Sequence, residues 1–152
     1  AVAGHQLGTA LSKQDEESVA ALPSSASCTS ASQIAALRAL PTSTLFAPID
    51  LGPAILQRTS HRVIGTAHHR NVLGMGKVIG AFLAKPDKAR DIITGSGADY
   101  LLMCPGINET KRYARTEPQG LGASLTQGHP PKWLQPVRID NLTSMQLYRI
   151  KR

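Results

Sequence analysis

Two histidines, an arginine and an asparagine stand side by side in the middle of the chain, as HHRN at residues 68–71. Imidazole nitrogens bind metal ions, and imidazole and guanidinium groups also bind phosphates and carboxylates. A metal ion needs further donors, and adjacent residues of a regular element cannot both point at one ion. The other candidate donors, His61, Asp50 and Asp99, lie far apart in the sequence. The sequence therefore predicts no metal site.

The same stretch fits an anion contact better, because it lies between an expected strand and an expected helix. Ligands of open α/β sheets bind at the carboxyl ends of strands, and the free N–H groups of a helix start favour anions. The candidate contact residues are Arg62, His68, His69, Arg70 and Asn71. The structural alternative is that Asn71 caps the helix, Arg70 forms a salt bridge and His69 bonds to a backbone carbonyl.

No motif for catalysis accompanies this stretch. The serines lack a GxSxG elbow, and we expect Asp50 to cap a helix and Asp99 to begin a strand. Gly74, Gly76 and Gly80 form GxGxxxG rather than GxGxxG, and they lie inside a helical pattern. We expect these glycines to allow close packing of that helix. The sequence therefore predicts no catalytic residue, no cofactor and no metal ligand.

Apolar periodicity and turn residues predict a chain in which helices and strands alternate. Helices are expected over residues 30–40, 51–59, 72–84, 88–94, 108–115 and 118–127, and strands over residues 44–49, 61–65, 98–104, 133–139 and 145–150. This order predicts an α/β fold: a three-layer Rossmann-like sheet, mostly parallel, with a C-terminal antiparallel hairpin at one edge. We expect residues 1–27 to be a flexible N-terminal tether and residues 28–152 to be a single α/β domain.

The chain is basic, with 17 Lys and Arg against 10 Asp and Glu in 152 residues, a net charge of +7. Such a charge can favour nucleic acid or an anionic membrane surface. The longest basic cluster is only RIKR at residues 149–152, and aromatic residues make up 4% of the chain. Because base stacking needs aromatic side chains among the cations, we expect no nucleic-acid partner. No apolar run of about 18 residues, the length that spans a bilayer, occurs in the sequence.

The two cysteines, Cys28 and Cys104, are far apart and form no CxxC motif. This spacing argues against a zinc site. The count is compatible with one disulfide in an oxidising compartment and equally with two unrelated buried thiols. The residues alone leave both alternatives open.

Three longer stretches carry a resemblance to a known group of proteins. They are LFAPIDLGPAILQRTSHRVIGTAHHRN, which follows a Leu-rich helix, then ADYLLMCPG, and then the closing PPKWLQPVRID and LYRIKR. With these motifs the chain resembles the soluble C-terminal domain of bacterial polytopic membrane proteins that are similar to the GT-C type, lipid-linked-sugar-dependent glycosyltransferases. In that group a tyrosine commonly precedes HRN, whereas this chain has His68 there.

The resemblance implies a domain on the periplasmic face of the bacterial inner membrane. Its partner would be the transmembrane portion of the same parent protein, and that portion would carry any glycosyl-transfer catalysis. This chain would then be a non-catalytic accessory or binding domain that contacts a glycan or an anionic lipid headgroup. In a periplasmic setting the resemblance also implies a disulfide between Cys28 and Cys104. The alternative is a small soluble α/β nucleotide-binding protein or enzyme.

Overall fold

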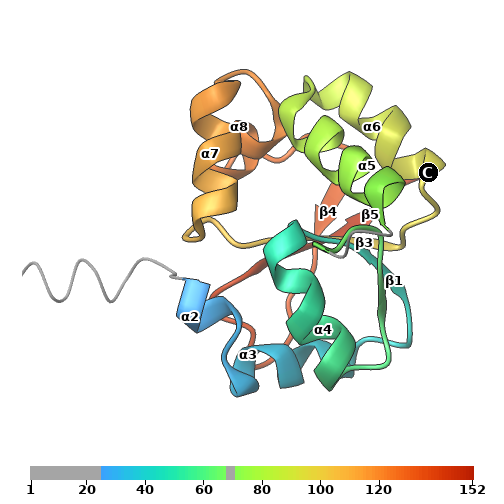
Figure 1. Ribbon diagram of the computed structural model, residues 1–152, viewed down its shortest axis with the longest axis vertical. Coiled ribbons are helices and arrows are strands. Elements are labelled where there is room, and N and C mark those ends of the chain that lie inside the picture. The colour runs from blue at the N-terminus through green and yellow to red at the C-terminus, as the bar shows by residue number, and fades with distance from the viewer. Residues whose placement is uncertain (1–24, 68–70) are drawn as a thin grey trace, which may run out of the picture.

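A five-stranded sheet with the strand order β2-β1-β3-β5-β4 forms the centre of the molecule (Figure 1). The computed structural model describes residues 25–67 and 71–152. The strands are β1 (Thr44–Phe46), β2 (Arg62–Val63), β3 (Tyr100–Met103), β4 (Leu134–Pro136) and β5 (Gln146–Ile150). Strand β1 runs parallel to β2 and β3, whereas β5 is antiparallel to β3 and β4. The structure thus confirms the α/β class and the C-terminal antiparallel hairpin at one edge.

The helices alternate with the strands as expected. They are α2 (Ser25–Cys28), α3 (Ala31–Ala36), the 3-10 helix η1 (Leu37–Ala39), the 3-10 helix η2 (Ile49–Leu51), α4 (Gly52–Arg58), α5 (Val72–Leu83), α6 (Pro86–Gly95), α7 (Asn108–Thr116) and α8 (Leu121–Thr126). Residues at the helix ends explain where several helices begin. The Ser30 side chain accepts a hydrogen bond from the Gln33 N–H at the start of α3, and Pro86 is the first residue of α6. Gly97 and Gly128 take positive φ angles after α6 and α8.

Side chains that alternate along the strands supply two apolar clusters, one on each face of the sheet. Phe46, Leu101 and Met103 belong to the first cluster, together with residues of α5 to α8. Leu45 and Leu102 belong to the second, together with residues of α2 to α4. Successive residues of a strand point to opposite faces, so the same two strands, β1 and β3, hold both helical groups in place. Figure 1 shows the two groups of helices above and below the strands.

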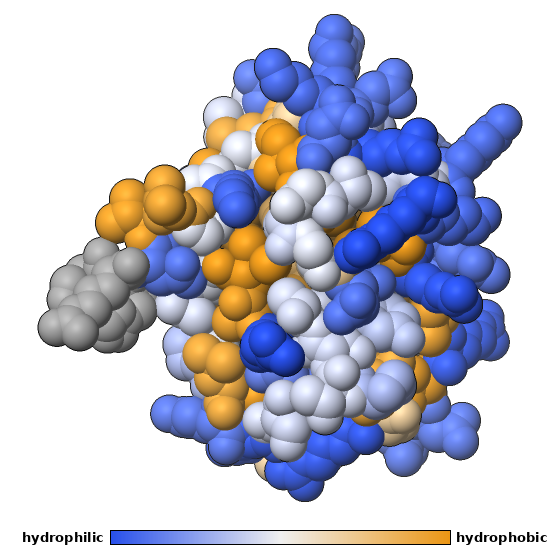
Figure 2. Space-filling model, turned by 90° about the vertical axis from the view of Figure 1, so that its right-hand side faces the viewer, coloured by the Kyte–Doolittle hydropathy of each residue, from blue (hydrophilic) through white to orange (hydrophobic). Residues whose placement is uncertain are grey.

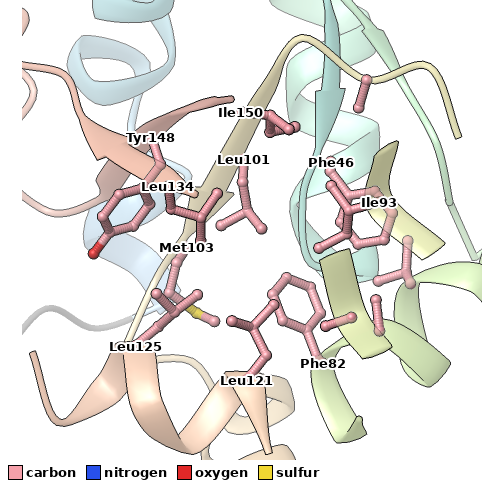
Figure 3. Packing of buried hydrophobic residues seen from close by; sticks show 14 of the residues in the cluster. Phe46, Phe82, Ile93, Leu101, Met103, Leu121, Leu125, Leu134, Tyr148 and Ile150 are labelled. Carbon is pink, nitrogen blue, oxygen red and sulfur yellow. The ribbon is translucent and has the colours of Figure 1, made fainter. Parts of the chain in front are cut away.

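Three aromatic rings link the sheet to two helices in the first cluster. The ring of Phe46 on β1 meets Phe82 of α5 edge-on, with centroids 5.8 Å apart. Phe82 in turn stacks on Tyr113 of α7 at 5.3 Å. Figure 3 shows Phe46 and Phe82 close together among the aliphatic side chains of the cluster. This contact fixes α5 and α7 against the end of β1, where the site described below begins.

The strand expected at residues 44–49 is shorter than predicted. Strand β1 ends at Phe46, and the chain turns after Pro48 into η2, which begins at Ile49. Asp50 therefore lies inside the 3-10 turn, and the prediction that Asp50 caps the following helix is wrong. Leu51 precedes α4 and makes no side-chain capping bond. The Asp50 N–H lies at the start of η2, where it donates to the Glu109 carboxylate at 2.8 Å.

Part of the predicted organisation lies outside the described residues. The flexible tether expected at residues 1–27 falls mainly on residues 1–24, which the structure does not describe. The same holds for residues 68–70, which carry three of the predicted contact side chains. Among the helices of the described ranges, none combines the length and the apolar character needed to cross a membrane.

Candidate functional site

The parallel strands β2, β1 and β3 have their carboxyl ends at the same end of the sheet, which we call its carboxyl edge. Three connecting segments leave the strands there. Residues 64–71 follow β2, residues 47–51 follow β1, and residues 104–107 follow β3. Segments at the carboxyl ends of parallel strands are the usual place for a ligand site in such sheets. The predicted contact residues lie in or next to the first of these segments.

Asn71 joins the start of α5 to the end of β2. Its side-chain amide donates a hydrogen bond to the Ile64 carbonyl oxygen at 3.3 Å, and its own carbonyl accepts one from the Met75 N–H at 3.0 Å. The side chain makes no capping bond to the helix. The predicted helix start at Asn71 is thus confirmed, but its side chain ties two elements together instead of capping α5.

Two of the five predicted contact residues, Arg62 and Asn71, are described by the structure, and they lie at different places. Arg62 is exposed at the start of β2, whereas Asn71 bonds to Ile64 just beyond the strand's end. His68, His69 and Arg70 belong to the residues that the structure does not describe. A joint anion contact by all five residues therefore stays a prediction.

The glycines of α5 differ in their surroundings. A Cβ at Gly74 would overlap the Ile64 carbonyl oxygen and the Asn71 side chain, so this glycine permits the close approach of α5 to the end of β2. A Cβ at Gly76 or Gly80 would meet no atom within 4 Å. The predicted packing role is confirmed for Gly74 and wrong for Gly76 and Gly80. The three glycines lie within helix α5, so they form no phosphate-binding turn between a strand and a helix.

Glu109 is the central polar residue of the segments that follow β1 and β3. One carboxylate oxygen accepts the Ile49 N–H at 2.8 Å, and the other accepts the Asp50 N–H at 2.8 Å. The Tyr113 hydroxyl donates a third bond to Glu109 at 2.6 Å. The first N–H groups of a helix lack partners within the helix, so the carboxylate of Glu109 from α7 caps η2 in place of Asp50.

Sequence reasoning missed this role of Glu109. The local signals were an acidic residue in the first turn of α7 and the spacing of four residues to Tyr113. Neither signal indicates η2, which lies about sixty residues earlier in the chain. Burial and the neighbouring Glu109 carboxylate raise the pKa of Tyr113 well above its ordinary value. The phenol therefore remains a hydrogen-bond donor at neutral pH.

A hollow of about 390 Å³ opens between η2, α5 and α7, next to this bond network. Ile79 and Leu83 of α5 give it an apolar wall, and Asp50 and Arg112 bring opposite charges to it. The Glu109 carboxylate also lines the hollow, but its oxygens already accept the three bonds described above. A carboxylate held in this way braces the fold and is not placed as a general base.

The remaining titratable candidates have structural partners. His61 is 4% exposed; its Nδ1 atom accepts the Ser43 N–H at 3.1 Å, and its Nε2 atom lies 2.6 Å from the Leu37 carbonyl oxygen. Asp99 accepts the Thr44 N–H at 2.9 Å, which agrees with its predicted structural role. Across residues 25–67 and 71–152 no three His, Cys, Asp or Glu side chains gather in a way that could hold a metal ion.

The predicted disulfide is confirmed, and it lies at the same edge of the sheet. Cys28 at the end of α2 is bonded to Cys104 directly after β3, with the Cα atoms 6.4 Å apart. Both cysteines are fully buried in the second apolar cluster. The bond joins the first described helix to the carboxyl edge of the sheet, so it restrains the segment that follows β3.

Comparison with known proteins identifies a similar fold. No protein-family model matches the chain, and no curated protein matches its sequence. Among solved structures, the chain is similar to the C-terminal globular domain of an oligosaccharyltransferase from Archaeoglobus fulgidus, with a TM-score of 0.55 over 76% of this chain and 89% of that chain. The two sequences are 12% identical, so the likeness concerns the fold alone.

Proposed function

We propose that this chain is a non-catalytic, extracytoplasmic accessory domain of a bacterial integral membrane protein of the GT-C glycosyltransferase type. The observation that carries the proposal is the fold similarity, which spans 89% of the C-terminal globular domain of an oligosaccharyltransferase. In this reading the helices on both faces of the sheet form a three-layer, Rossmann-like domain. The transmembrane portion of the same parent protein is its partner and carries the catalysis.

The disulfide supports the proposed location. A buried bond between Cys28 and Cys104 forms and persists in oxidising compartments and is rare in reducing ones. This bond supports an extracytoplasmic location, and within the proposal that location is the periplasmic face of the bacterial inner membrane.

The proposed contact of the domain is an anionic phosphate, from a lipid headgroup or a lipid-linked glycan. Its binding residues are Arg62, His68, His69, Arg70 and Asn71. Two features support this choice: the segment leaves the carboxyl edge of the parallel strands, and it leads into the first turn of α5, where Asn71 makes no side-chain capping bond. The N–H groups of the first turn of a helix favour an anion, and in this proposal the Arg70 guanidinium adds charge-assisted hydrogen bonds.

We assign no reaction to the domain, because its candidate polar groups are engaged in structural bonds. Glu109 is bound by two backbone N–H groups and by Tyr113, and it braces η2 after β1. His61, which precedes β2 at the other end of the strands, lies buried between Ser43 and Leu37. We assign the domain a supporting and positioning role beside the membrane-embedded catalytic site.

The contact is tested with soluble anions, without a membrane. Inorganic phosphate and pyrophosphate are titrated into the chain while backbone amide signals are followed by NMR. We expect shifts at Asn71 and Val72, and binding weaker by about 10- to 100-fold for Arg70→Ala, since one charge-assisted hydrogen bond contributes about 1.5–3 kcal/mol. Arg90→Ala is the matched control, because Arg90 is an exposed arginine on α6. If Arg70→Ala binds both anions as well as the unchanged chain does, the contact is refuted.

A further inference from the structure

Helix α5 carries apolar residues on the side that faces away from the core. Val78, Ala81 and Phe82 are buried against the first cluster. On the outward side, Val72 is 68% exposed, Leu73 84% and Ile79 37%. The outer side of a surface helix is ordinarily polar, and a helix that is apolar all round usually has a second apolar neighbour. Isolated exposed apolar residues are common, but here three lie on one helix of twelve residues.

The two outward glycines extend this apolar side. Gly76 and Gly80 have open space where a Cβ would stand, so no side chain there covers the helix backbone. Val72, Gly76 and Gly80 recur at intervals of four residues and lie on one side of the helix. Figure 2 shows apolar surface that projects at the left edge of the face turned toward the viewer. We call the set Val72, Leu73, Gly76, Ile79 and Gly80 the outer α5 face.

Two cations lie at the border of this face. Lys77 is the one charged residue within the α5 sequence VLGMGKVIGAFL, and it is exposed. Arg112 of α7 lines the hollow beside Ile79 and Leu83. The hollow also contains Asp50 and Glu109, but the Glu109 carboxylate is bound by backbone N–H groups and Tyr113. With a net charge of +7, the chain combines an apolar projection with cations at its border.

We propose that the outer α5 face docks on the surface of an anionic lipid bilayer. Apolar side chains of a surface-bound helix enter the boundary between headgroups and acyl chains, and nearby Lys and Arg side chains meet anionic headgroups. Val72 and Leu73 project from the molecule, so they fit a fluid bilayer, while Lys77 and Arg112 lie at the level of the phosphates. The inference rests on the proposed function, because the proposed parent protein supplies the bilayer, and it adds the surface by which the domain faces it.

The test is flotation of the full chain with lipid vesicles. One vesicle contains equimolar phosphatidylcholine and phosphatidylglycerol, and the other contains phosphatidylcholine alone. We expect binding to the anionic vesicle, and about a tenfold lower partition coefficient for the double variant Val72→Ser/Leu73→Ser. Leu56→Ser is the matched control, because Leu56 is 49% exposed on α4, away from the outer α5 face. Thermal unfolding of each variant checks that it is folded.

Several results would overturn the docking proposal. They are no binding to the anionic vesicle, an unchanged partition coefficient in the double variant, or an equal loss in Leu56→Ser. A concentration-dependent dimer that the double variant loses, without vesicle binding, would assign the face to a second copy of the chain. Failure of this proposal is distinct from failure of the anion contact: Ile79→Ser, which changes the outer α5 face outside the first turn of the helix, is expected to weaken vesicle binding and to leave soluble pyrophosphate binding unchanged, whereas Arg70→Ala is expected to lose pyrophosphate.

Discussion

At the scale of single residues, Glu109 connects parts of the chain that are distant in sequence. It brings the N–H groups of Ile49 and Asp50 to α7, and it holds the hydroxyl of Tyr113. Buried polar groups are costly when they lose a partner, whereas a satisfied network fixes one arrangement. The position of η2, and with it the end of β1, therefore depends on this one carboxylate.

Replacing Glu109 by Ala should lower the free energy of unfolding by about 2–4 kcal/mol, because three donors lose a charged acceptor. Urea unfolding followed by circular dichroism measures the change. Glu117→Ala is the control: Glu117 is exposed at the end of α7, and we expect a change within about 0.5 kcal/mol. Equal effects of the two substitutions would refute the bracing role.

The raised pKa of Tyr113 makes stability depend on alkaline pH. The folded chain keeps the phenol protonated at pH values where the unfolded chain, with a pKa of about 10, has begun to release the proton. The stabilisation is therefore complete below about pH 10 and is lost as the pH rises further. Tyr113→Phe should show a smaller loss of unfolding free energy between about pH 8 and about pH 10.5 than the unchanged chain. Equal losses in both proteins would speak against the buried, bonded phenol.

At the scale of elements, α5 contains two glycines at which substitution by alanine should change the free energy of unfolding in opposite directions. Gly74→Ala should lower the free energy of unfolding by about 1–3 kcal/mol, because its Cβ would overlap the Ile64 carbonyl oxygen. Gly76→Ala should raise it by about 0.5–1 kcal/mol, because the position is open and alanine favours helix more than glycine does. Denaturant unfolding gives both values. Stabilisation by both substitutions would show that α5 does not approach the end of β2 so closely.

The order of the elements could be predicted from the sequence because its signals are local. Apolar periodicity, the proline at the start of α6 and the glycines after α6 and α8 all act within a few residues. The end of β1 and the cap of η2 could not be predicted in the same way, since Glu109 lies about sixty residues from both. The different roles of Gly74 and Gly76 likewise depend on which backbone lies opposite each of them.

The candidate site was predictable only in part. The pairing of Cys28 with Cys104 followed from the resemblance and not from the residues, and the structure confirms it. Asn71 was identified as a helix start, but its bond to Ile64 depends on how α5 packs beside β2. The hollow beside Arg112 brings together three segments that are separate in sequence, so no motif marks it.

At the scale of the whole molecule, the disulfide restrains the largest part of the chain. Cys28 and Cys104 are separated by 76 residues, so the bond reduces the entropy of a long loop in the unfolded state. The double variant Cys28→Ser/Cys104→Ser should lose about 4 kcal/mol of unfolding free energy in the chain-entropy model. Urea unfolding measures this loss. Two reactive thiols in denatured, unreduced protein would contradict the bond.

The central claim is that this domain serves a larger membrane protein, and the coding sequence upstream of Ala1 tests it most directly. If the domain serves such a protein, the open reading frame continues upstream through several apolar segments of about 20 residues, each long enough to span a bilayer. A stop codon upstream, followed by a start codon directly before Ala1, would contradict it.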